Sequence, residues 1–371
     1  MIEVHESARR IRVEPRGIPP LWLRILHPVL SVLAAAVVGA AILAATGHAP
    51  IEAYRKVFTA GFGDSRVLAR SLILSTPLIL TALAAAIPFR MKVWNIGAEG
   101  QLYLGAICGS GVALVLGDGL PAIIILPAMM LGGMVGGALW AGLAALPKAY
   151  LNTDEVITTL MLNFIALHLL SYLIFGSVSF WRATERVIFP SGKSIPEAAR
   201  LVKIWGPLHA GFLIALAAAV LVWLLLRSTR WGFELRVMGD SARSARYSGM
   251  RVDRKLVSVL LISGALAGLA GAIEVSGPIG GLEPVALSTG MGFTGIVVAA
   301  VARLSALGII PVAILIAGLS NSTTGLQSLG IPIDTVFVLQ GLIFLFVVGG
   351  EFFLENRVRL RLRKRIGVGS S

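Results

Sequence analysis

The chain has little charge, one cysteine and few histidines for its length. Only 14% of its 371 residues are charged, whereas a soluble domain carries roughly 25%. The single cysteine, Cys108, excludes an intramolecular disulfide and a thiolate metal cluster. The five histidines show neither His-x-x-x-His spacing nor a Ser/His/Asp grouping. We therefore expect no metal site and no catalytic centre, and most of the chain should not face water.

A phosphate-binding loop for ATP is also missing. The nearest string, at 192–194, has Val187 where the first glycine of Gly-x-x-x-x-Gly-Lys-Ser/Thr is required. Ion-coupled carriers usually have acidic residues deep in the membrane. Here the acidic candidates all lie near predicted span ends: Glu99, Glu274, Asp334 and Glu351. A chain that transports a solute would therefore depend on a partner for its energy.

Long apolar runs are what the sequence has instead. Mean hydropathy is +0.86, and 56% of the residues are hydrophobic. A hydrocarbon core about 30 Å thick needs roughly 20 apolar residues per helix. We place such runs at 24–46, 67–89, 98–117, 120–146, 155–178, 208–227, 257–276, 291–303, 306–320 and 333–350. Because lipid tolerates no unpaired backbone groups and the runs lack barrel-like alternation, we predict an all-α polytopic transmembrane helical bundle with about ten spans.

The basic residues fall mainly on one side of this bundle. With a cytoplasmic N-terminus, 23 of the 32 Lys and Arg residues lie in cytoplasmic segments and 9 in external ones, as the positive-inside rule expects. Both termini are then cytoplasmic. The net charge of +13 is explained by orientation and anionic headgroups rather than by nucleic acid. We predict a basic cytoplasmic segment at 1–23, a transmembrane domain at 24–350 and a basic cytoplasmic tail at 351–371.

The string from Trp94 to Gln101 breaks the chain between two spans, after Pro88 ends the preceding helix. One interpretation is structural: Asn95 is the N-cap of the next helix, and Glu99 lies in its first turn, where the helix dipole favours an anion. The other is functional: a glycine-rich break lets Asn95, Glu99 and Gln101 line a polar cavity. The sequence favours neither, and both can hold together.

A polar stripe follows in the fifth predicted span. Glu155, Thr159 and Asn163 recur every four residues, which places them on one helical face. Interhelical hydrogen bonds, worth about 0.6 kcal/mol each, explain any one of them, and a place along a solute pathway is the alternative. The candidate pathway residues are Asn95, Glu99, Gln101, Thr159 and Asn163.

The internal loop 228–256 contains a short amphipathic pattern. Its candidate residues are Asp240, Ala242, Arg243, Ala245, Arg246 and Gly249. The aspartate is placed to cap a short helix and the glycine to end it. The two alanines form a small apolar ridge at i, i+3, beside a ridge of two arginines suited to carboxylate-lined surfaces. A loop that only sets topology needs no capped helix, so we interpret this segment as a docking site for a partner protein.

Four strings, in order along the chain, resemble one protein family. They are NIGAEGQ at 95–101, LNTDEVITTLMLN at 151–163, GFELRVMGDSARSARYSGM at 232–250 and GFTGIVVAAVARLSALGI at 292–309. Together they resemble the inner-membrane permeases of bacterial ABC importers for simple sugars and nucleosides. The first two strings are more similar to the nucleoside branch, which basic membrane lipoproteins serve, than to the ribose branch.

The resemblance implies a function and a set of partners. It implies a permease subunit of the bacterial cytoplasmic membrane that performs no bond chemistry, binds no cofactor and moves nucleosides or related small sugars by alternating access. It also implies a second related permease, a cytoplasmic ABC ATPase that binds ATP and Mg²⁺, and an extracytoplasmic binding lipoprotein, with 240–249 as the coupling helix. The alternatives are a permease for ribose or branched-chain amino acids, or an ion-coupled secondary transporter.

Glycines mark two further features. The cluster of Gly290, Gly292 and Gly295, on the predicted outer side, mirrors the break at Gly97 and Gly100 on the inner side, which suggests an inverted repeat. GxxxG spacing permits close helix packing. It occurs at Gly132/Gly136, Gly133/Gly137 and Gly264/Gly268.

Overall fold

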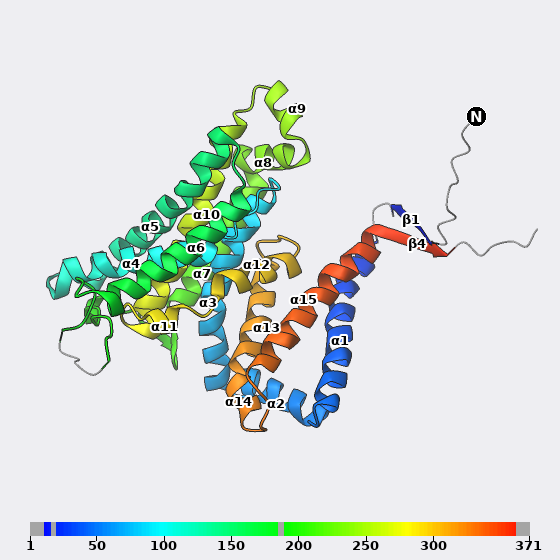
Figure 1. Ribbon diagram of the computed structural model, residues 1–371, viewed down its shortest axis with the longest axis horizontal. Coiled ribbons are helices and arrows are strands. Elements are labelled where there is room, and N and C mark those ends of the chain that lie inside the picture. Colours follow the sequence, from blue (N-terminus) through cyan, green and yellow to red (C-terminus); the bar gives the residue numbers. More distant parts are fainter. Residues whose placement is uncertain (1–10, 16–19, 185–188, 361–371) are drawn as a thin grey trace, which may run out of the picture. The chain divides into compact units, whose positions relative to one another are not determined.

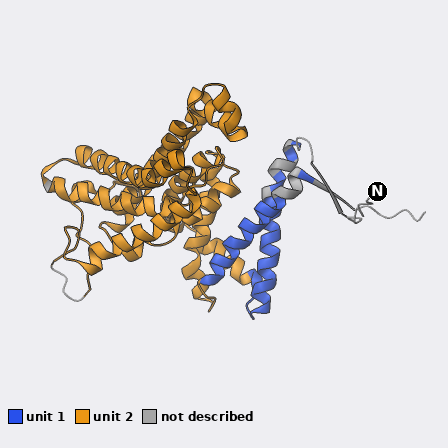
Figure 2. Cartoon of the chain, turned by 45° about the horizontal axis from the view of Figure 1, so that its top comes forward, with its two compact units in different colours: residues 1–51, 334–371 blue, residues 52–333 orange. Residues whose placement is uncertain are grey.

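The chain folds into two compact helical units in the computed structural model, which describes residues 11–15, 20–184 and 189–360. One unit comprises residues 52–333. The other comprises the described residues up to 51 and from 334 onward (Figure 2). Helices dominate both units, which confirms the predicted all-α fold class.

The larger unit is built from helices α2 to α14 (Figure 1). Their bounds are α2 (Pro50–Phe62), α3 (Ser65–Phe89), α4 (Ala98–Leu116), α5 (Ala122–Leu151), α6 (Glu155–Ser171), α7 (Gly211–Ser228), α8 (Arg230–Asp240), α9 (Ala242–Tyr247), α10 (Val252–Glu274), α11 (Pro284–Leu287), α12 (Met291–Val301), α13 (Ile309–Asn321) and α14 (Thr323–Gln327). π-helical turns extend α6 and α10, at Tyr172–Gly176 and Val275–Ile279. Two short strands, β2 (Lys203–Trp205) and β3 (Leu208–His209), pair antiparallel before α7.

The smaller unit pairs the two ends of the described chain. Helix α1 (Leu21–Ala45) packs on α15 (Asp334–Glu355), and strand β1 (Ile11–Pro15) pairs antiparallel with β4 (Asn356–Leu360). The predicted basic segments 1–23 and 351–371 fall partly on these elements, while 1–10, 16–19 and 361–371 lie outside the described residues. The division of the chain at residues 23 and 350 stays a prediction.

Eight helical segments of the described chain are long and apolar enough to cross a bilayer. The bent pair Val29–Ala45 and Pro50–Phe62 gives a ninth, and the shorter apolar helix Asp334–Gly350 is a further candidate. The two shortest predicted spans correspond to the segment Pro284–Val301, which joins α11 to α12, and to α13 with α14. The elements are therefore consistent with the predicted number of about ten.

Helices α3 and α10 form the centre of the larger unit. Of their most apolar stretches, 78% and 72% are buried, against 28% to 33% for α5, α6 and α7. The outer helices turn large apolar side chains away from the protein: Leu131, Leu139, Ile165 and Leu213 are examples. Apolar residues all round a helix are typical of a membrane span, because lipid and neighbouring helices are both apolar solvents for it.

Close glycine contacts hold α4, α5 and α10 together. Gly133 and Gly137 of α5 face Gly264 and Gly268 of α10, and Gly105 of α4 also lies against Gly268. A Cβ atom at any of these positions would overlap atoms of the neighbouring helix. These contacts confirm that the GxxxG spacings are helix-packing sites.

Candidate functional site

Buried hydrogen bonds hold the segment that connects α3 to α4. The structural interpretation of Asn95 as the N-cap of α4 was wrong, because α4 begins at Ala98 with Gly97 as its cap residue. Asn95 lies two residues earlier, and its Oδ1 accepts a hydrogen bond from the Gly97 N–H at 2.9 Å. Its amide group also pairs with the amide of Gln101 and donates to Ser263 Oγ at 2.7 Å. The side chain therefore ties the break to α10.

The polar stripe of α6 faces the same break. Asn163 Nδ2 donates to the Ile96 carbonyl at 2.8 Å, and its Oδ1 accepts from the Gly100 N–H at 2.8 Å. Thr159 Oγ1 accepts a hydrogen bond from the Ile96 N–H at 3.3 Å. Glu155 forms an ion pair with Lys148 at 2.7 Å. The stripe lies on one buried face, as predicted, and it satisfies backbone groups that the break in the helix leaves unpaired.

Glu99 joins this break to a second one. Its carboxylate accepts hydrogen bonds from Tyr103 Oη at 2.5 Å, from the Gly290 N–H at 3.1 Å and from the Gly292 N–H at 2.5 Å. Gly290 and Gly292 lie at the N-terminus of α12, where free N–H groups and the helix dipole stabilise an anion. The prediction that the two glycine clusters lie on opposite sides of the membrane was therefore wrong, because they contact each other.

Different contacts hold the two ends of α12. Beyond its C-terminal end, the Leu304 carbonyl accepts a hydrogen bond from Arg90 Nη2 at 2.8 Å, and Arg90 directly follows α3. The 11 residues of α12 span about 16 Å at 1.5 Å per residue. This length separates the contact of Arg90 with Leu304 from the bond between Glu99 and Gly292.

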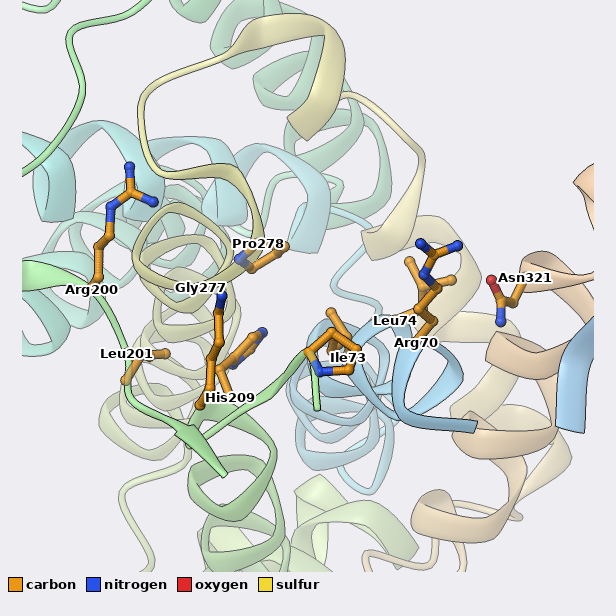
Figure 3. A pocket seen from close by; sticks show the side chains of 11 residues that line it. Arg70, Ile73, Leu74, Arg200, Leu201, His209, Gly277, Pro278 and Asn321 are labelled. Carbon is orange, nitrogen blue, oxygen red and sulfur yellow. The ribbon is translucent and has the colours of Figure 1, made fainter. Parts of the chain in front are cut away.

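We call the five residues around these breaks the polar joint: Asn95, Glu99, Gln101, Thr159 and Asn163. Each is at most 4% exposed and each is hydrogen-bonded within the chain. None of them lines the cavity shown in Figure 3. The arrangement holds the start of α4 against the start of α12 in this conformation, and contact of these side chains with a solute stays a prediction.

The predicted docking segment forms α8 and α9. Asp240 is the last residue of α8 and does not cap α9, contrary to our prediction. The N-cap is Ser241, whose extended backbone lets its Oγ accept a hydrogen bond from the Ser244 N–H at 3.2 Å. Gly249 ends the segment as predicted, with φ at +78° and its N–H donating to the Arg246 carbonyl.

The exposed face of α9 differs from the predicted one. Ala245 is fully buried within the chain's own core, so it cannot enter a groove of a partner, and only Ala242 of the predicted alanine ridge is exposed. Arg246 Nη2 forms an ion pair with Asp253 at 2.8 Å. Arg243 and Tyr247 form an exposed pair, with the guanidinium 5.9 Å from the ring centroid and Tyr247 80% exposed. The i, i+4 spacing of these two residues was the sequence signal that we missed.

A second site, which the sequence reasoning did not find, is a cavity of about 480 Å³, which we call the outer cavity because the charge count predicts its basic residues to lie outside. Figure 3 shows Arg200 and His209 on one side of this outer cavity and Arg70, Ile73 and Asn321 on the other. These residues come from the start of α3, the end of α13 and the loop before α7. The available signal was the charge count, which assigned the basic residues of this loop and of α3 to the same side of the membrane.

His209 gives the outer cavity a buried hydrogen-bond donor. The side chain is 3% exposed, and its Nδ1 accepts a hydrogen bond from the Gly211 N–H at 3.2 Å. In the neutral ring the proton is then on Nε2, which has no partner in the described part of the chain. Burial lowers the pKa of His209, so the imidazole is held in this neutral form.

Comparison with known proteins identifies the family. The family described as branched-chain amino acid transport system, permease component, matches residues 67–348. The chain is 36% identical to the glucose ABC transporter permease protein TsgB13 of Haloferax volcanii, covering 96% of this chain and 95% of that protein. It is 33% identical to the guanosine ABC transporter permease protein NupP of Bacillus subtilis (87% and 92% covered) and 30% identical to the nucleoside ABC transporter permease protein NupB of Lactococcus lactis (90% and 92%). The chain therefore belongs to the family of branched-chain amino acid transport system permease components, as a multi-pass membrane subunit of ABC transporters.

Proposed function

We propose that the chain is the permease subunit of an ATP-driven importer for nucleosides or related small sugars. Relatives with such names align over nearly their whole length. The observation that carries the proposal is the construction of α9, which is anchored by the buried Ala245 and presents Arg243 and Tyr247 outward. A segment that transmits force needs both a firm attachment to the bundle and a free surface for the partner that drives it.

Membership of the family implies a partner ATPase and a substrate-binding protein. We assign ATP and Mg²⁺ to the ATPase, and we propose that a second, related permease completes the membrane pore as a heterodimer. The chain then acts as a transporter subunit and leaves hydrolysis to its partner. The binding protein delivers solute to the outer face.

We propose that the membrane is the bacterial cytoplasmic membrane and that both termini lie in the cytoplasm. Arg90, Arg236 and Arg303, which the positive-inside count assigns to the cytoplasm, line one cavity of the larger unit. Arg70 and Lys203, which the same count assigns to the outside, line the outer cavity. This grouping of the charges supports the orientation.

A continuous set of contacts connects α9 to the polar joint. Helix α9 packs on α8, and Gly239 of α8 packs so closely on the Arg90 carbonyl that a Cβ atom there would overlap it. Arg90 in turn holds the Leu304 carbonyl beyond the end of α12, the helix whose N-terminus binds Glu99. We propose that closure of the two ATPase halves displaces α9, which rotates α3 and α12 together around the polar joint. This rotation opens the solute pathway to the other side of the membrane.

The outer cavity is the proposed first contact for the solute. His209 lines this cavity, and its Nε2–H is buried and has no partner among the described residues, so a base carbonyl or a sugar hydroxyl oxygen that displaces the neighbouring atoms would accept its hydrogen bond. We assign the predicted pathway role of the polar joint to a later stage of transport, after the start of α4 and the start of α12 have moved apart.

The second candidate is a permease for branched-chain amino acids. The outer cavity is lined by Arg70, Arg200 and Lys203, and such basic residues favour a solute that carries a carboxylate. An ion-coupled carrier is the third reading, and it requires transport without the ATPase.

Uptake by proteoliposomes that contain both permeases and the ATPase, supplied with the binding protein, separates these candidates. We expect ATP-dependent uptake of guanosine, competed by other nucleosides and not by leucine. Uptake of leucine without guanosine would transfer the assignment to the amino-acid permease. His209→Phe should raise the KM for guanosine with a smaller effect on kcat, because it removes the donor from the entry site.

A further inference from the structure

Four arginines from four separate segments meet at the inner end of the larger unit. Arg90 follows α3, Arg227 lies in the last turn of α7, Arg236 lies on α8, and Arg303 lies in the turn between α12 and α13. Together with Trp223 they line a cavity of about 300 Å³, which we call the arginine pocket. No carboxylate is among the described residues that line it.

Protein contacts fix the guanidinium groups of Arg90 and Arg236 but use only one donor of each among the described residues. Arg90 Nη2 donates to the Leu304 carbonyl at 2.8 Å, and Arg236 Nη1 donates to the Leu226 carbonyl at 2.5 Å. Each guanidinium carries five N–H donors. The Arg90 Nε–H is buried and has no hydrogen-bond partner among the described residues. The arginine pocket therefore contains an unsatisfied buried donor.

The electrostatics of the arginine pocket favour an anion. Burial, and secondly the charge of Arg236, lower the pKa of Arg90, which means that the two cations repel each other. Neither Arg90, Arg227 nor Arg236 forms a salt bridge within the described part of the chain. Planar guanidinium groups bind phosphate oxygens through paired hydrogen bonds, so a phosphate group would relieve the repulsion and use the free donors.

The position of the arginine pocket at the edge of the bilayer points to a lipid as the source of that phosphate. On α7, Val220 and Leu224 are exposed and lie at i, i+4, and Arg227 follows at i+7 on the same face. An apolar face suited to acyl chains thus leads directly to the arginine pocket. The Arg227 guanidinium stacks 5.2 Å from the Trp223 ring centroid, and tryptophan is typical of the headgroup level.

We propose that the arginine pocket binds the phosphate headgroup of an anionic phospholipid, whose acyl chains lie along the Val220–Leu224 face of α7. Such a lipid would join α3, α7, α8 and the turn after α12, and three of these, α3, α8 and the turn, carry the contacts from α9 to the polar joint. The site is independent of the solute that the permease carries.

Native mass spectrometry and thermal unfolding of the purified full chain test the site. The variant is the double substitution Arg227→Gln with Arg236→Gln. The matched control is Arg230→Gln with Arg251→Gln, which removes the same charge from exposed positions outside the arginine pocket. The probes are phosphatidylglycerol, phosphatidylcholine and inorganic phosphate, added to chain in a neutral detergent.

For the parent chain and the control we expect retained phosphatidylglycerol adducts and a raised melting temperature with phosphatidylglycerol, but not with phosphatidylcholine or inorganic phosphate. The variant should bind phosphatidylglycerol about 30-fold more weakly, since each arginine near an anionic headgroup is worth about 1 kcal/mol, while its melting temperature without lipid stays close to that of the control. Equal phosphatidylglycerol binding by variant and control would overturn the proposal. An equal effect of inorganic phosphate would make the pocket a free-phosphate site. A third result would also overturn the proposal: neither phosphatidylglycerol nor inorganic phosphate binds the parent chain, and the ATPase co-purifies with the control but not with the variant. The arginine pocket would then be a protein interface.

Discussion

Glu99 Oε2 accepts a hydrogen bond from the Gly292 N–H at 2.5 Å, although the two residues are 193 positions apart in the chain. The bond connects the break before α4 to the break before α12. Gly292 permits this contact because it has no Cβ atom, which would overlap the backbone of Glu99. The start of α4 is thus held against the start of α12.

Substitution of Gly292 by alanine should weaken this joint. The added methyl group meets the Glu99 backbone, which cannot move aside as a flexible side chain would, so we expect a loss of about 1–3 kcal/mol in the free energy of unfolding. The measurement is the melting temperature of the purified chain in detergent. Gly341→Ala is the control, because a Cβ atom there meets nothing within 4 Å, and helix propensity predicts no loss of stability for it. Equal melting temperatures for the two variants would contradict the close contact.

Asn163→Leu separates a structural role from a solute contact. The substitution leaves the Ile96 carbonyl and the Gly100 N–H without their partner, and each unpaired buried group costs about 1–3 kcal/mol. We expect a lower melting temperature together with lower uptake. The exposed substitution Ile165→Leu on the same helix should change neither. Normal stability with abolished uptake would instead assign Asn163 to the solute pathway.

Charge reversal on α9 should uncouple the permease from its ATPase. Arg243→Glu with Arg246→Glu reverses two exposed charges and breaks the ion pair of Arg246 with Asp253, so we expect loss of ATPase co-purification and of uptake, with normal membrane insertion. Arg230→Glu, at an exposed position on α8, serves as the control. An ATPase that still co-purifies with the doubly reversed chain would remove α9 as the docking segment.

Stability should fall as pH decreases below about 6.5, the ordinary pKa of histidine. Burial lowers the pKa of His209 in the folded protein, so in this range the unfolded chain binds more protons than the folded one, and acid favours unfolding. The stability that neutral His209 contributes is fully present above the pKa of this residue in the unfolded chain. It is lost as the pH falls toward its pKa in the folded protein. Melting temperatures of the parent chain and of His209→Gln should therefore converge as pH is lowered. A constant difference between them from neutral pH down to pH 5 would show that His209 does not titrate as inferred.

The sequence predicted the fold and part of the site for identifiable reasons. Long apolar runs determine membrane spans almost directly, and GxxxG spacing located the contact of Gly133 with Gly268. The stripe of Thr159 and Asn163 was predicted because residues four positions apart lie on the same face of a helix, and in the structure that face is buried. The partner of the stripe was not predictable, since local patterns contain no information about which distant backbone groups lack hydrogen bonds.

The errors have the same origin. Asp240 and Ser241 are both good caps, and the packing of α8, rather than propensity, decides which residue ends the helix. Ala245 was interpreted as docking surface because a small residue suits a partner groove and the chain's own core equally well. The outer cavity at His209 depends on three segments that meet only in the folded protein.

ATP-dependent guanosine uptake into proteoliposomes tests the central claim most directly. We expect uptake when this chain, the second permease, the ATPase and the binding protein are all present with ATP. We expect none when the ATPase is omitted or when the chain carries the Arg243→Glu and Arg246→Glu substitutions. Solute movement by the purified chain alone, driven by an ion gradient without the ATPase, would contradict the claim.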